Sequence, residues 1–105
     1  MKSSKIRQSA RGEQCTLQIH PYCNGNPETT VLAHLPSQSH GIGLKSPDWW
    51  AVYSCSGCHD VIDSRNPHAI RELGWDEVNR CIMRGLFRTQ QRLQEKGLIQ
   101  VKGAA

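Results

Sequence analysis

The sequence has little material for a hydrophobic core. Of its 105 residues, 37% are hydrophobic and 6% are aromatic, with a single phenylalanine. A chain of this length forms one domain, and a core so short of large apolar residues gains much from a metal or covalent cross-link. We therefore expect one small domain that depends partly on such a cross-link.

Long apolar runs are also absent. No segment approaches the ~20 apolar residues of a membrane-spanning helix. The basic residues 1–7 are not followed by the apolar stretch of a signal peptide. We expect a cytoplasmic protein with reduced cysteines and no membrane partner.

Positive charge is concentrated at the two ends of the chain. The net charge is +4, with the excess of Lys and Arg in residues 1–13 and 80–105, whereas residues 14–79 are net acidic. Basic ends suit contact with the phosphates of nucleic acid. On the last predicted helix, arginines recur every four residues and so form a slowly winding basic row. We expect this row either to bind phosphate or to be a solvated face paired with acidic residues; its members are Arg80, Arg84, Arg88 and Arg92.

Five cysteines are many for such a chain, and in a reducing compartment they favour metal binding over disulfides. Cys55 and Cys58 flank a Ser-Gly turn that is small enough to bring both sulfurs to one ion. Cys15 and Cys23 form a second pair, and four thiolates suit a structural Zn²⁺. Two alternatives stay open: a mixed site in which His20 replaces one cysteine, and a group of buried free thiols.

Two further points concern the cysteines: the fifth cysteine, Cys81, and a second interpretation of residues 55–59. Cys81 lies within a predicted helix and is expected to be a buried small hydrophobic residue. Residues 55–59 also match the attachment signature of c-type haem, Cys-x-x-Cys-His. Haem c is normally attached outside the cytoplasm, and it would leave Cys15 and Cys23 unexplained, so we rank it well below zinc.

The pattern between the cysteine pairs predicts a β-hairpin. Residues 29–35 are β-branched and apolar and form a first strand ending near His34. Residues 37–47 are a polar loop, and residues 48–54 form the returning strand. His34 and His59 then lie at the two ends of one hairpin.

After His59 the periodicity becomes helical. Asp63 falls one turn beyond His59 and on the same face. Asn66 and Pro67 predict a new helix that Gly74 ends. A longer helix is predicted over residues 76–96, closed by a glycine at 97, with an apolar stripe at Val78, Ile82, Leu86 and Leu93.

These motifs resemble the HNH, or His-Me finger, endonucleases over residues 13–64: a cysteine pair, a strand closed by histidine, a second strand, and Cys-x-x-Cys-His opening a helix. More specifically, residues 10–12, 23–29, 32–34 and 55–63 resemble the small prophage nucleases of the YbcO type. The resemblance implies a small α+β protein. Residues 13–64 would be a zinc-stapled ββα-metal (HNH or treble-clef-like) core. Residues 1–12 are polar, basic and rich in serine, and we expect them to be a basic flexible arm. The helical pattern of residues 65–105 predicts a helical extension with a basic last helix.

The resemblance also assigns roles to residues. His34 matches the general base, His59 matches a ligand of the catalytic divalent ion, and Asp63 matches a further ligand in some branches. The sequence departs from the motif at Ala33, where an acidic or histidine ligand is usual, and at Trp50, where the middle asparagine falls. Asp48 and Asp60 are the candidates to compensate.

The sequence therefore predicts a metal-dependent phage or prophage endonuclease that cleaves nucleic acid, with DNA the expected substrate. Phosphodiester cleavage needs a group that takes a proton from water near neutral pH and a cation for the developing negative charge. His34 would supply the first, and Mg²⁺ or another divalent ion on His59 and Asp63 the second. The alternative is a zinc-stapled nucleic-acid-binding module without catalysis, which Ala33 and Trp50 favour.

Overall fold

The computed structural model describes residues 4–36 and 46–103 and shows an α+β fold, as the sequence predicted. A two-stranded antiparallel sheet pairs β1 (Val31–His34) with β2 (Ala51–Ser54), with His34 opposite Ala51. The predicted strands, residues 29–35 and 48–54, were longer. The residue pattern of a strand can continue past the residues that pair with the neighbouring strand. Part of the predicted loop, residues 37–45, lies outside the described residues.

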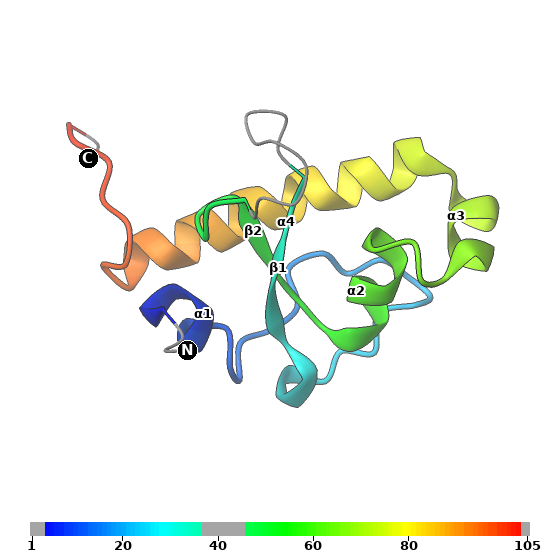
Figure 1. Cartoon of the computed structure of the whole chain (residues 1–105), viewed down its shortest axis with the longest axis horizontal. Coiled ribbons are helices and arrows are strands. Elements are labelled where there is room, and N and C mark those ends of the chain that lie inside the picture. The colour runs from blue at the N-terminus through cyan, green and yellow to red at the C-terminus, as the bar shows by residue number, and fades with distance from the viewer. Residues whose placement is uncertain (1–3, 37–45, 104–105) are drawn as a thin grey trace.

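Helices surround this small sheet (Figure 1). Helix α1 (Lys5–Ser9) precedes the sheet, and a 3₁₀ turn, η1 (Pro27–Thr29), leads into β1. Helices α2 (Ser56–Ile62), α3 (Pro67–Leu73) and α4 (Trp75–Glu95) follow β2. The long α4 runs along the whole molecule, with α3 at one end and α1 near the other.

The predicted helix boundaries are confirmed closely. Asn66 caps α3 by accepting a hydrogen bond from the backbone of Ala69, and Pro67 occupies the first turn. Gly74, with φ of 80°, separates α3 from α4, and this left-handed conformation is one that glycine adopts without strain. Helix α4 begins at residue 75 and ends at residue 95, one residue from each predicted end.

The buried side of α4 differs from the predicted stripe. Val78 and Leu93 are fully buried, but the line between them runs through Cys81, Gly85 and Thr89. Ile82 and Leu86 only flank the core. Small and polar residues line this contact because the chain around Leu17 comes very close: a Cβ on Gly85 would stand 2.7 Å from Leu17 Cδ2.

The N-terminal segment is packed onto the domain where the structure describes it, and is not the flexible arm that its composition suggested. Ser4 caps α1 by accepting a hydrogen bond from the backbone of Arg7. Ser9 Oγ lies 2.6 Å from the Tyr53 hydroxyl, and Ala10 is buried beside Tyr53 and Leu93. Every helix in the described ranges is too short or too polar to span a lipid bilayer.

Candidate metal centre and histidine cleft

Four cysteines from three parts of the chain converge in the core. The sulfurs of Cys15, Cys23, Cys55 and Cys58 all lie within 4.8 Å of one another, and the Cys23 and Cys55 sulfurs are 3.8 Å apart. Sulfurs bound ~2.3 Å from a tetrahedral zinc lie about 3.8 Å from each other. The four-cysteine set therefore fits one Zn²⁺. The alternative with His20 is not favoured, because His20 is exposed and outside this set.

The pKa values of the clustered thiols also favour a bound cation. A hydrogen bond from the Cys58 thiol, opposed by burial, lowers the pKa of Cys15 to about 4. The same hydrogen bond, together with burial, raises the pKa of Cys58 above its usual range. Burial raises the pKa of Cys23 to about 11. Four thiolates can coexist here only with a positive ion between them, which is what a thiophilic metal provides.

The turn that carries Cys55 and Cys58 requires its small residues. Cys55 caps α2, its sulfur accepting a hydrogen bond from the Cys58 backbone N–H at 3.4 Å. A Cβ on Gly57 would overlap the carbonyl oxygen of Tyr22, so only glycine allows the two cysteine loops to meet. Both sulfurs are fully buried and directed at the other two, which disfavours haem attachment. Cys81 is buried in α4 outside the cluster, as predicted.

His34 lies at the end of β1 and is held by a carboxylate. Its Nε2 is 2.7 Å from Asp48 Oδ1. Asp48 also accepts hydrogen bonds from Ser4 Oγ at 2.5 Å and from Arg7 Nε at 3.4 Å. Burial raises the pKa of Asp48, but the hydrogen bonds from Ser4 and His34 and the charge of Arg7 outweigh burial and lower it overall. The ionised carboxylate therefore fixes the imidazole ring.

His59 makes a second imidazole–carboxylate pair on α2. Its Nε2 lies 3.1 Å from Asp63 Oδ2, one helical turn away, as the sequence predicted. Arg65 is 3.3 Å from the same carboxylate and 3.2 Å from Asp60. Asp60 is thus engaged with Arg65, and Asp48 is the acidic residue that meets His34.

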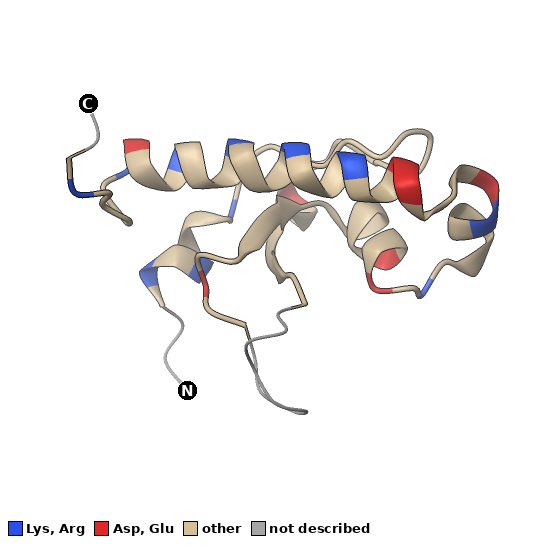
Figure 2. Cartoon of the chain, turned by 90° about the horizontal axis from the view of Figure 1, so that it is seen from above, with Lys and Arg blue, Asp and Glu red and all other residues tan. Residues whose placement is uncertain are grey.

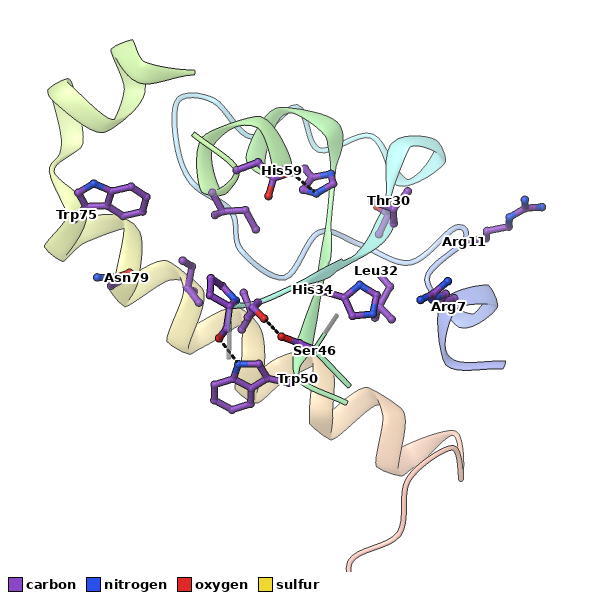
Figure 3. A pocket seen from close by; sticks show the side chains of 16 residues that line it. Arg7, Arg11, Thr30, Leu32, His34, Ser46, Trp50, His59, Trp75 and Asn79 are labelled. Carbon is purple, nitrogen blue, oxygen red and sulfur yellow. Dashed lines mark hydrogen bonds and ion pairs between the residues drawn. The ribbon is translucent and has the colours of Figure 1, made fainter. Parts of the chain in front are cut away.

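Both histidines line one cavity of about 980 Å³ (Figure 3). His34 comes from β1 and His59 from α2, so residues 25 positions apart in sequence reach the same space. Arg7 and Arg11 lie on one side of the histidines, and Trp75 and Asn79 of α4 lie on the other. Thr30 is 3% exposed and also lines the cavity, and its hydroxyl has no hydrogen-bond partner among residues 4–36 and 46–103.

Known relatives share this architecture over most of its length. The sequence model of the family described as "Putative nuclease YbcO" matches residues 4–98. The chain belongs to the YbcO family. It is 42% identical, over 95 residues, to the proteins of that name from Escherichia coli K12 and from Enterobacteria phage 82, which covers 90% of this chain and 95% of each relative. A solved structure of a "putative bacteriophage protein" from Escherichia coli aligns at a TM-score of 0.71 and 38% identity, covering 89% of this chain and 100% of that one.

In this YbcO-family chain the arginine row on α4 faces away from the histidine cavity. Trp75, Asn79 and Ile82 are the α4 residues that line the cavity, and at ~100° per residue the row falls on the opposite side of the helix. Figure 2 shows this row as blue bands along one side of α4.

Three members of the row have partners within the protein, and the fourth is weakly held. Arg80 pairs with Glu77 at 2.7 Å and Arg92 with Glu13 at 2.8 Å. Arg84 Nη2 donates to the carbonyl oxygen of Leu17 at 2.6 Å, which ties α4 to the loop after Cys15. Arg88 reaches Gln18 Oε1 at 3.3 Å. The main contact of Arg84 is therefore within the protein, where it holds α4 against the loop after Cys15.

The sequence did not predict that Arg7, Arg11, Trp75 and Asn79 lie beside the two histidines. Arg7 and Arg11 were predicted only as part of a basic arm, and the helical start of α1, capped by Ser4, is the signal that could have placed them. Trp75 and Asn79 are four residues apart and so share one face of α4. The sequence shows this spacing, but it does not show which part of the protein that face meets.

Proposed function

We propose that this chain is a metal-dependent endonuclease of the HNH type, which hydrolyses phosphodiester bonds in nucleic acid, with DNA as its substrate. The relatives named as nucleases support the hydrolytic activity. The observation that carries the proposal is that two histidines, each paired with a carboxylate, line one cavity that has two arginines at one end.

His34 serves as the general base in this proposal. An imidazole takes a proton from water near neutral pH, and that water then attacks the phosphorus in line with the leaving oxygen. Asp48 accepts from Nε2 of the ring, which orients His34. Arg7 and Arg11 hold the phosphate backbone by charge.

His59 and Asp63 are the residues that would hold the divalent ion. An imidazole nitrogen and a carboxylate oxygen 3.1 Å apart on one helix face would give such an ion two ligands. A bound Mg²⁺ or similar ion supplies positive charge for the developing oxyanions.

The second candidate function is a zinc-stapled nucleic-acid-binding module without catalysis. Ala33 favours it, because this residue precedes His34, points to the other face of β1 and is only 1% exposed. It offers no metal ligand beside the base.

Plasmid nicking distinguishes the two functions. The parent protein should nick supercoiled DNA with Mg²⁺ or Mn²⁺ and not without them. His34→Ala should lower the rate per mole of zinc-loaded protein by about 10²–10⁴-fold, because a positioned general base is lost. The matched control is His68→Ala, since His68 is exposed on α3, where it pairs with Glu72.

The expected control result is an unchanged rate. Equal nicking by the parent and His34→Ala would assign any cleavage to another group and would favour the binding module. His59→Ala should lose activity with partial recovery at high Mn²⁺, which separates the loss of an ion ligand from the loss of the base.

A further inference from the structure

The cavity beside the two histidines extends well beyond what a phosphate group needs. Its volume is about 980 Å³, at the top of the ~300–1,000 Å³ range of sites that enclose organic ligands. Much of its wall is apolar or aromatic and is contributed by β1, α2, α4 and the residue before β2; the residues that matter here are Leu32, Ile62, Trp50, Trp75 and Ile82.

The two tryptophans of this wall differ in how firmly their rings are held and in how exposed they are. Trp50 is half-buried, and its indole N–H donates to the Pro36 carbonyl oxygen at 2.9 Å, so its ring is fixed. Trp75 stands at the start of α4 and is 45% exposed. Asn79, one turn further, lies beside Trp75 at the same end of the cavity (Figure 3).

The two ends of the cavity therefore differ in chemical character: one is basic and the other is aromatic and polar. Arg7 and Arg11 lie at one end, the histidines in the middle, and Trp75 with Asn79 at the other end. Arginines attract phosphates, whereas an exposed indole stacks on a planar base and an amide can hydrogen bond to a base edge. A paired duplex hides the faces of its bases in the stack, so it offers nothing to the Trp75 end.

We propose that the Trp75–Asn79 end of this cavity binds an unpaired nucleobase next to the scissile phosphate, so that the protein prefers single-stranded or locally unpaired nucleic acid over continuous duplex. This inference rests on the proposed function for the position of the phosphate. The base stacks on Trp75, and its backbone runs past His34 and His59 toward Arg7 and Arg11.

Binding measured without cleavage tests the proposal separately from the nuclease activity. The experiment uses fluorescence anisotropy of a labelled oligothymidylate and of a labelled duplex of equal length, with no added Mg²⁺ or Mn²⁺. The parent should bind the single strand several-fold more tightly. Trp75→Ala should weaken single-strand binding by about 5–150-fold, the range expected for losing one stacked base, and should change duplex binding by less than about twofold.

The matched control is Trp49→Ala. Trp49 is 52% exposed, similar to Trp75, but it does not line the cavity. Its replacement should leave both affinities unchanged. Tighter binding of duplex by the parent, or equal losses for both substrates in Trp75→Ala, would overturn the proposal.

A second measurement does not require truncation of the ring. Oligothymidylate should quench tryptophan fluorescence of the parent and of Trp49→Phe, and should quench Trp75→Phe much less. Equal quenching in both Phe variants would contradict the stacking role. A protein that shows these binding results but, with Mg²⁺ or Mn²⁺, cleaves neither supercoiled plasmid nor oligothymidylate would keep this inference and lose the proposed function.

Discussion

The carboxylate of Glu13 joins the beginning of the domain to its end. It accepts hydrogen bonds from Arg92 at 3.1 and 2.8 Å and lies 2.6 Å from Lys96 Nζ. The Arg92 hydrogen bond, opposed by burial and supported by Lys96, lowers the pKa of Glu13 to about 2. Two cations of α4 and its C-terminal cap are thus held next to the segment that leads into Cys15.

Replacing Glu13 with Gln should lower the melting temperature by roughly 2–6 °C, as expected for a partly exposed ion pair. A carboxylate with a lowered folded-state pKa stabilises the fold above its ordinary pKa of 4.5 and loses this effect as pH falls toward about 2. The difference between parent and variant should therefore be equal at pH 8 and pH 5.5. Glu95→Gln, which removes only the exposed Arg92–Glu95 pair, is the control and should shift melting less.

A difference between parent and Glu13→Gln that had already vanished at pH 5.5 would contradict this assignment. So would a Glu95→Gln variant that melts as low as Glu13→Gln, because the stabilisation would then belong to Arg92 within its own helix.

At the residue scale the convergence of the four cysteines was predictable and the acidic partner of His34 was not. Cys-x-x-Cys carries its geometry in its spacing, so Cys55 and Cys58 could be named without a structure. Asp48 and Asp60 were equivalent candidates in the sequence. Only the packing of α1 selects Asp48, because Ser4 and Arg7 approach it from that helix.

At the scale of elements, helix α4 has three distinct sides. One side packs in the core through Val78, Gly85 and Thr89. A second lines the cavity, and the third carries the arginine row. Sequence periodicity predicted the helix and its ends, but it assigned the core to the largest apolar residues. It missed Thr89, whose hydroxyl accepts from the Tyr53 backbone N–H at 3.0 Å.

Because Arg7 and Arg11 line the cavity and the α4 arginine row does not, we expect Arg7 and Arg11 to contribute more to nucleic-acid binding. The double variant Arg7→Ala/Arg11→Ala should weaken binding of a labelled oligonucleotide and reduce its salt dependence by about two phosphate contacts. The double variant Arg80→Ala/Arg88→Ala removes the same charge from the face opposite the cavity and should have a smaller effect. Titrations across salt concentrations check both. A larger loss in the second variant would make the α4 row the phosphate surface.

At the scale of the whole molecule, the cysteine cluster is part of the hydrophobic core. Cys15, Cys55 and Cys58 are buried in the main cluster, together with Leu17, Ile19, Val52 and Val61. The largest fully buried side chain, Tyr53, belongs to a separate smaller cluster near α1. Few large residues hold the centre of the domain, so the binding energy of an ion there contributes directly to folding. The α+β class and the cluster of four cysteines that could hold a metal ion were predicted from the sequence motifs, whereas the meeting of α1 with the sheet was not.

A metal ion held by the four cysteines should be needed for folding. Purified protein should contain one zinc per chain by metal analysis. Cys58→Ser should lose the zinc and its cooperative melting, because three thiols leave an incomplete site in the centre of the core. Cys81→Ser is the matched control: its sulfur is also buried, at 3% exposure, but lies outside the cluster, so zinc content should stay at one and melting should change only modestly. A strong chelator should unfold the parent and Cys81→Ser alike, and added Zn²⁺ should restore both, as circular dichroism would record. Parent protein without stoichiometric zinc, or a Cys58→Ser variant that melts like the parent, would show that packing alone maintains this core.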